Sequence, residues 1–119
     1  MKILIADDDR LVRTMLADLL GQLGHEVIAA ENGVEAVALW KREGGELLVL
    51  DLLMPRLSGL DALRAMRQAG CSAPAILLTA ISDPSVREME GADEVRVRLE
   101  KPVTRRSLER ALARAMGDR

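Results

Sequence analysis

Short apolar runs alternate with longer amphipathic stretches along the 119 residues of this chain. The runs Ile3–Ala6, Leu47–Leu50 and Ala75–Leu78 are continuous, which is typical of strands buried on both faces of a parallel sheet. Two weaker runs, Val27–Ala30 and Val95–Leu99, bring the set to five. The last run alternates apolar residues with arginine and therefore predicts an edge strand with one solvated face.

The stretches between these runs have helical spacing and residues that can cap helices. Apolar residues recur at intervals of three and four after the first run and stop at Gly24. Capping residues precede the other helical patterns: Asn32, Ser58, Asp83 and Thr104. The helix that opens at Asp83 is predicted to be short and to fade by Gly91. A helix thus follows each strand, which indicates one (βα)5 domain over residues 1–119.

The expected fold class is therefore α/β, a flavodoxin-like three-layer sandwich around a central parallel five-stranded sheet. Right-handed crossovers and the strand order 2-1-3-4-5 place the first and third strands side by side. The chain leaves these two strands in opposite directions, which opens a crevice at their carboxyl ends. Open α/β sheets bind their ligands in such a crevice.

Polar groups stand where the apolar runs stop: Asp7, Asp8 and Asp9 after the first, Asp51 after the third, Thr79 after the fourth and Lys101 after the fifth. Two carboxylates about 4 Å apart repel by about 4 kcal/mol at an effective dielectric near 20, so clustered acids must hold protons or bind a cation. Oxygen ligands with open positions favour Mg²⁺, which also binds phosphate oxygens. An aspartate can itself accept a phosphoryl group. The hydroxyl and the ammonium would then contact the phosphoryl oxygens.

Each of these groups alone has a simpler explanation. The acids at residues 7–9 could favour a helix N-terminus, Asp51 could be a turn residue, and Lys101 could be a solvated loop lysine. Their joint occurrence at four adjacent strand ends favours a site instead. Pro102 biases Lys101 toward an extended backbone, and a cis bond there would direct the lysine into the crevice.

Composition narrows the classes of function. A formal net charge of −2 argues against electrostatic binding of nucleic acid, and Trp40 as the single aromatic residue excludes a base-stacking platform. No signal peptide is visible and no apolar run approaches membrane-spanning length, so we expect a cytoplasmic protein that contacts neither nucleic acid nor membrane directly. The lone Cys71 excludes an internal disulfide, and its predicted loop position indicates an incidental thiol.

The ordered motifs resemble the receiver domain of bacterial two-component response regulators (CheY-like) over essentially the whole chain. The opening run with its three aspartates is similar to the acidic-pair strand of that family. The segment Asp51-Leu52-Leu53-Met54-Pro55, with Gly59, is similar to its phosphoacceptor motif. Thr79-Ala80 and Lys101-Pro102 complete the set. Any one of these motifs is weak evidence, whereas the ordered set is specific.

The resemblance implies a phosphorelay role in signal transduction. Asp51 would accept a phosphoryl group from a phosphohistidine on a sensor histidine kinase or a phosphotransfer protein. Mg²⁺ would be bound directly by Asp8, Asp51 and the backbone carbonyl of Leu53, and through water by Asp7. The domain would assist its own phosphorylation and dephosphorylation without being an enzyme.

The resemblance also assigns phosphate-binding and switch roles. Lys101 would pair with the carboxylate or the phosphate, and Thr79 would move toward the phosphate. The phosphate would shift an existing two-state equilibrium of the domain and alter the surface of the fourth helix, fifth strand and fifth helix. A downstream effector or a covalently linked output domain would recognise that surface.

Two positions depart from the family pattern. Receivers usually carry Tyr or Phe three residues before the strand-5 lysine, and this chain has Arg98 there. A charged guanidinium resists entry into an apolar slot, so we expect a switch with a different or partner-dependent readout. The segment Gly91-Ala92-Asp93 resembles the turn before the fifth strand but lies about three residues farther from Lys101 than usual, which predicts a short fourth helix and a long following loop.

Two other functions fit part of the pattern. Phosphatases of the haloacid dehalogenase type also use Asp-x-Asp after the first strand, here Asp7 and Asp9, together with a threonine and a lysine. That class further requires an acidic pair after the lysine, which is absent after Lys101. A receiver-like domain that docks a partner without phosphorylation is the other alternative, which Arg98 leaves open and the intact acidic set opposes.

Overall fold

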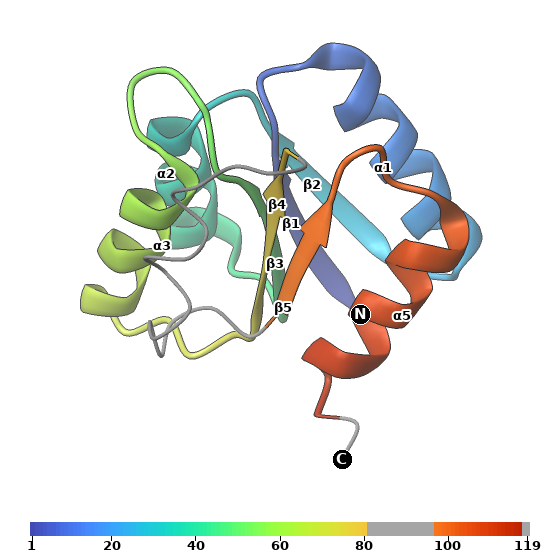
Figure 1. Ribbon diagram of the computed structural model, residues 1–119. Coiled ribbons are helices and arrows are strands. Elements are labelled where there is room, and N and C mark those ends of the chain that lie inside the picture. The colour runs from blue at the N-terminus through green and yellow to red at the C-terminus, as the bar shows by residue number, and fades with distance from the viewer. Residues whose placement is uncertain (81–96, 118–119) are drawn as a thin grey trace.

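The computed structural model describes residues 1–80 and 97–117 of the chain (Figure 1). Five parallel strands form one sheet in the order β2-β1-β3-β4-β5, which confirms the predicted topology. The strands are β1 (Lys2–Ala6), β2 (Glu26–Ala30), β3 (Leu47–Asp51), β4 (Ala75–Thr79) and β5 (Val97–Glu100). Val95 and Arg96 of the predicted fifth strand lie outside the described residues.

Helices cover both faces of this sheet and make the predicted three-layer sandwich (Figure 1). On one face lie α1 (Arg10–Gln22) and α5 (Arg105–Ala115), and on the other lie α2 (Gly33–Glu43) and α3 (Gly59–Gln68). The predicted fourth helix from Asp83 to Gly91 lies outside the described residues, and so does the segment 91–93. No helix within residues 1–80 or 97–117 is long and apolar enough to span a bilayer.

Alternation along the central strands divides the core between the two faces. Ile3 and Ile5 of β1 pack with the α1 and α5 side, and Leu4 and Ala6 pack with the α2 and α3 side. All residues of β3 and β4 are buried, because helices cover these strands on both faces. Each fully buried leucine or isoleucine stabilises the fold by about 1.5–3 kcal/mol, so these strands hold the sheet edge rigidly.

The predicted edge position of β5 is confirmed. β5 pairs with β4 alone, and buried residues alternate with exposed ones along it. Val97 and Leu99 are buried, whereas Arg98 and Glu100 are exposed. The solvated face of the strand therefore carries the arginine at the position where receivers usually have an aromatic residue.

Polar side chains cap the helices as the sequence predicts and fix where each chain segment turns away from the sheet. Asp9 accepts the backbone N–H of Leu11 at 2.9 Å, and Asn32 accepts that of Glu35 at 2.8 Å. Ser58 and Thr104 cap α3 and α5 in the same way. A cap of this kind contributes about 1 kcal/mol and also sets the path of the preceding loop.

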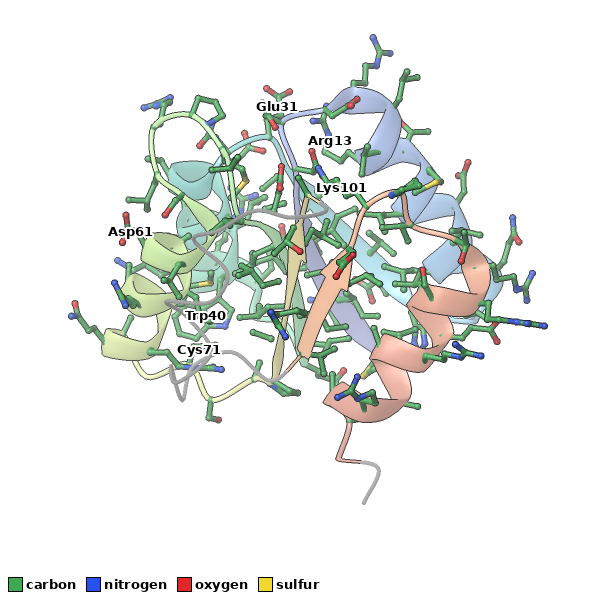
Figure 2. The ribbon with its side chains drawn as sticks, viewed as in Figure 1. Arg13, Glu31, Trp40, Asp61, Cys71 and Lys101 are labelled. Carbon is green, nitrogen blue, oxygen red and sulfur yellow. The ribbon has the colours of Figure 1, made fainter. Side chains whose placement is uncertain are left out.

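The lone cysteine lies in a loop, as predicted, but its thiol is buried. Cys71 is 5% exposed and belongs to the core cluster between the sheet and α2 and α3, against which the partly buried Trp40 packs (Figure 2). The guanidinium of Arg67 donates to the Cys71 carbonyl at 3.2 Å and lies 3.7 Å from its sulfur. These contacts of Arg67 hold the loop against the core. Sequence spacing alone does not indicate that Cys71 is buried there.

Close packing between α3 and β3 leads to a test of stability. A Cβ atom at Gly59 would collide with the Asp51 carbonyl oxygen, whereas a Cβ at Gly21 in α1 would meet nothing within 4 Å. We expect Gly59→Ala to lower the free energy of unfolding by about 1–3 kcal/mol, because backbone must move. Gly21→Ala is the matched control and should raise it by up to about 1 kcal/mol through helix propensity. Urea denaturation measures both, and an unchanged stability of Gly59→Ala would contradict the packing argument.

Candidate functional site

Three carboxylates meet at the carboxyl edge of the sheet. One carboxylate oxygen from each of Asp7, Asp8 and Asp51 lies within 4.8 Å of the others. The reason is topological: β1 and β3 are neighbouring parallel strands, with Ala6 beside Leu50, so the residues that follow them emerge side by side. The structure thus brings together the acids that the sequence placed on separate strand ends.

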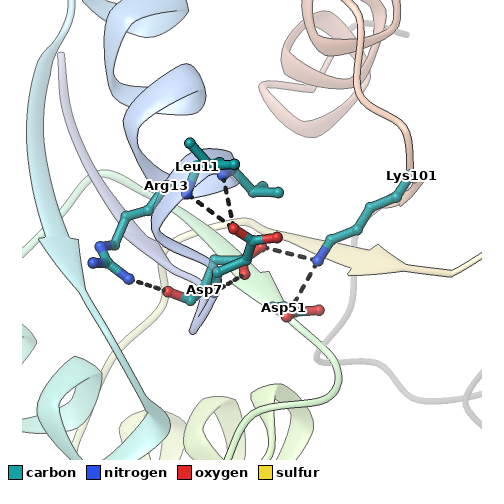
Figure 3. Close-up of polar contacts among 7 residues, drawn as sticks. Asp7, Leu11, Arg13, Asp51 and Lys101 are labelled. Atoms are coloured by element: carbon teal, nitrogen blue, oxygen red, sulfur yellow. Dashed lines mark hydrogen bonds and ion pairs between the residues drawn. The ribbon is translucent and has the colours of Figure 1, made fainter.

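Asp7 is the most deeply buried of the three acids, with no exposed surface. Its Oδ1 accepts the backbone N–H of Asp9 at 2.8 Å, and its own N–H donates to the Ala30 carbonyl at 3.2 Å. Its Oδ2 has no hydrogen bond of good geometry and is balanced by the ammonium of Lys101 at 3.0 Å (Figure 3). This oxygen therefore has coordination capacity that the described residues do not fill.

Lys101 bridges two of the acids. Its ammonium lies 3.0 Å from Asp7 Oδ2 and 3.3 Å from Asp51 Oδ2 (Figure 3). The Lys101–Pro102 peptide is cis. The Lys101 backbone N–H also donates to the Thr79 carbonyl at 2.8 Å, which ties the lysine loop to the end of β4.

The carboxyl group of Asp51 is held in an electrostatically unfavourable place. Burial and the neighbouring charge of Asp7 raise the pKa of Asp51 from 3.8 to about 6. The charge and hydrogen bond of Lys101, and a hydrogen bond with the backbone of Leu53, lower the same pKa and limit the rise. At neutral pH Asp51 is therefore mostly ionised, and its buried charge lowers the stability of the fold. A further cation beside it would offset this destabilisation.

The same acids also change the pKa of Lys101. Its partial burial by itself lowers the pKa of Lys101, but the close contact with the Asp7 carboxylate and the charges of Asp51 and Asp7 outweigh that effect. The net pKa of Lys101 is raised above its ordinary value. The lysine is therefore fully charged at neutral pH and remains available to an anionic group.

The donor set fits a hard divalent cation. Three carboxylates face one ammonium, which leaves an excess of two negative charges when all the acids are ionised. All the side-chain donors are oxygens, and Asp8 is exposed to solvent at the mouth of the cluster. Mg²⁺ prefers oxygen ligands and keeps several waters, so a partly open carboxylate cluster of this charge suits it.

The remaining candidate residues lie around this cluster. Thr79 is buried at the end of β4, next to β3 in the sheet. Leu53 follows Asp51 by two residues, and its side chain is 65% exposed. Arg98 lies on the exposed face of β5, so the structure does not bury it beside the acids.

Sequence reasoning missed one residue of the site, Arg13. Its guanidinium donates to the backbone carbonyl of Asp7 at 2.8 Å (Figure 3). The available signal was its place in α1, one helical turn after the capping Asp9, from which a long side chain can reach back to the preceding loop.

The raised pKa of Asp51 predicts how stability depends on pH. Between about pH 4 and pH 6 the folded state binds this proton more tightly than the unfolded chain, so ionisation lowers stability as the pH rises through that window. We expect Asp51→Asn to be more stable than the parent at pH 7.5 without metal, by about 3 kcal/mol at most for a shift of this size. The gap should close as the pH falls to 4. Thermal unfolding in EDTA across this range measures it.

In Asp51→Asn, Lys101 keeps its contact with Asp7. The variant therefore removes the buried charge of Asp51 without leaving the ammonium unpaired. Asp61→Asn, an exposed acid in the first turn of α3, is the control and should show no such pH-dependent gain. A parent protein as stable as Asp51→Asn at every pH would contradict the electrostatic assignment.

A family model and several known proteins match this chain. The model of the response regulator receiver domain family matches residues 3–113. Response regulator MprA of Mycobacterium leprae is 42% identical over 117 residues, which cover 96% of this chain and 49% of that protein. The probable transcriptional regulator ycf27 of Porphyridium aerugineum is 41% identical over 112 residues, which cover 91% of this chain and 45% of that protein.

Solved structures show the same architecture. The chemotaxis protein CheY4 of Vibrio cholerae matches with a TM-score of 0.88 and 28% identity, over 96% of this chain and 97% of that one. A receiver domain protein from Clostridium thermocellum matches with a TM-score of 0.86 and 28% identity, over 97% and 93%. The chain spans about half the length of the curated relatives it matches. With the family model covering nearly its whole length, this chain belongs to the response regulator receiver domain family, whose members act in phosphorelay signalling.

Proposed function

We propose that this domain is a Mg²⁺-dependent phosphoacceptor switch, phosphorylated on Asp51. The observation that carries the proposal is the lysine bridge. One ammonium contacts both Asp7 and Asp51, while an oxygen of Asp8 lies within 4.8 Å of oxygens of the same two acids. This arrangement offers a nucleophilic carboxylate, a cation and a set of oxygen ligands within one cluster.

The cation site would be formed by the acids and one loop carbonyl. Asp8, Asp51 and the backbone carbonyl of Leu53 would bind Mg²⁺ directly, and Asp7 would bind through water. The fit rests on the excess of negative charge and on the unfilled Asp7 Oδ2. When bound, Mg²⁺ would supply positive charge to the transferring phosphoryl group.

The side chains of this chain would carry out the transfer as follows. A carboxylate oxygen of Asp51 attacks phosphorus, the N–P bond of the donor phosphohistidine breaks, and the released imidazole takes up a proton. Lys101 already lies 3.3 Å from the Asp51 carboxylate and would hold the negative charge of the phosphoryl group. The Thr79 hydroxyl would donate to a phosphoryl oxygen. The resulting state would shift the domain between two existing conformations.

We further propose that the domain turns over no external phosphate ester. A phosphatase of the Asp-x-Asp type would use Asp7 as its nucleophile. Asp7 has no exposed surface, and its Oδ1 accepts the Asp9 N–H, so an external phosphate ester would have poor access to it. Among the described residues, Asp51 contacts the Lys101 ammonium and the backbone of Leu53, and its side chain is 8% exposed, which makes it the better placed acceptor.

The partners in the proposal follow from the class of chemistry. A sensor histidine kinase or a phosphotransfer protein would donate the phosphoryl group, and a downstream effector or a linked output domain would recognise the altered surface. That surface would include β5 and α5, where Arg98 and the exposed arginines of α5 stand. We propose no direct contact of this domain with nucleic acid.

Phosphorylation of Asp51 can be tested by intact mass. Incubation with acetyl phosphate and Mg²⁺ should add the mass of one phosphoryl group to the parent protein. Asp51→Asn should gain none, because an amide oxygen is a poor nucleophile, and EDTA should prevent the gain in the parent. Asp9→Asn is the matched control, since this acid caps α1, and it should still be labelled. An unchanged mass of the parent, or label on Asp51→Asn, would refute the proposal.

The arginine at position 98 predicts a readout that differs from that of most receivers. Burying a guanidinium costs more than burying an aromatic ring, so the inward movement of an aromatic side chain cannot operate here. We expect the beryllofluoride-treated parent to remain monomeric in sedimentation velocity. Arg98→Tyr should dimerise more strongly under the same conditions, with Asp51→Asn as the unresponsive control. Family-typical dimerisation of the parent through the β5 and α5 face would contradict this expectation.

A further inference from the structure

Arg13 connects the first helix to the loop that carries two of the three acids. Its side chain is 17% exposed and reaches back from α1 to the loop (Figure 2). One guanidinium nitrogen donates to the backbone carbonyl of Asp7 at 2.8 Å (Figure 3). The other lies 4.0 Å from the carboxylate of Glu31, in the loop after β2. The residue is therefore a mostly buried cation that contacts the loop backbone and no carboxylate of the acidic cluster.

The backbone of this loop is held on each side of Asp8. The Asp7 N–H donates to the Ala30 carbonyl, and the Asp9 N–H donates to the Asp7 carboxylate at 2.8 Å. The Asp9 carbonyl accepts the backbone N–H of Arg13 at 2.9 Å. The Asp7 carbonyl of this stretch accepts from the Arg13 side chain.

Asp8 itself has no such support. Within residues 1–80 and 97–117, no side-chain hydrogen bond or ion pair holds its carboxylate. Other residues therefore influence the direction of this carboxylate only through the Asp8 backbone. The peptide between Asp7 and Asp8 is planar, so fixing the Asp7 carbonyl oxygen also fixes the direction in which the chain enters Asp8.

We propose that Arg13 is a positioning residue for the magnesium site: by holding the Asp7 carbonyl it aims the Asp8 carboxylate at Asp7 and Asp51. The inference rests on the proposed function, because it assigns a support to the ligand set named there. It adds a residue that touches neither the ion nor the phosphoryl group. Outer partners of this kind set the orientation of ligands that would otherwise rotate freely.

Charge and positioning predict opposite effects, which makes the role of Arg13 testable. A positive charge near the cluster repels Mg²⁺, so an arginine that acted by charge alone would weaken binding, and its removal would tighten it. An arginine that positions Asp8 would instead strengthen binding, and its removal would weaken it. The sign of the change in Mg²⁺ affinity separates the two roles.

The test is a titration of the chain with MgCl₂ followed by ¹H–¹⁵N NMR of the loop amides. We expect Arg13→Gln to raise the Kd for Mg²⁺ about tenfold, the low end of the loss seen when an outer partner of a metal ligand is removed. Arg10→Gln is the matched control, because Arg10 is an exposed arginine of the same helix and loses the same charge. It should leave the Kd unchanged or lower it.

A second measurement needs no metal. In the metal-free protein, the Asp9 amide should exchange with solvent several-fold faster in Arg13→Gln than in the parent, because its bond to the Asp7 carboxylate depends on the loop conformation. Glu31→Gln should change both readouts little. Its carboxylate is 69% exposed and lies at 4.0 Å from the guanidinium, a surface contact that contributes weakly.

The outcomes separate this inference from the proposed function. A parent protein whose loop amides do not respond to Mg²⁺ would overturn both. A parent that binds Mg²⁺, with Arg13→Gln binding equally or more tightly, would overturn the positioning role alone. If Arg13→Gln does not fold, Arg13→Lys replaces it, since lysine keeps the charge but has one donor atom in place of the planar fork. A Kd raised about threefold or more then supports the role, and an unchanged Kd overturns it.

Discussion

Repulsion among three acids at one edge of the sheet is the constraint on which the site depends. A single lysine offsets it by contacting Asp7 at 3.0 Å and Asp51 at 3.3 Å, and the pKa of Asp51 is still raised to about 6. Breaking a buried charge pair costs more than exposed pairs contribute, so the partly buried Lys101 stabilises the site more than a surface lysine would. The remaining negative charge would favour a cation bound among these acids.

The fold provides the rigidity that holds these charges together. Side chains of β3 and β4 are buried on both faces, and capping residues fix the start of each helix next to the sheet edge. Gly59 allows α3 to approach the carbonyl of Asp51 closely. A site built on strand ends and short capped loops cannot relax the repulsion by moving apart, because movement would disrupt the core on both sides.

In the proposed function, this arrangement would link phosphorylation to a conformational response. Without a metal the acids repel one another, so a group that neutralises them binds more tightly because it relieves this repulsion. A phosphoryl group on Asp51 would change the partner of Lys101, whose backbone is tied to Thr79 at the end of β4. The change would reach β5, the edge strand whose exposed face carries Arg98. Few residues would therefore separate the phosphorylated Asp51 from the exposed face of β5.

The sequence by itself determined the strands, the acids at their ends, Thr79 and Lys101, because apolar runs, the polar residues that end them and helix caps are local signals. The strand order followed from the general rules for parallel α/β sheets. Only the tertiary structure decided that Asp7 is fully buried while Asp8 is exposed, that Cys71 lies in the core, and that Arg13 holds the Asp7 carbonyl. Burial of a polar group and the reach of a long side chain depend on segments far apart in the chain, and no local pattern encodes them.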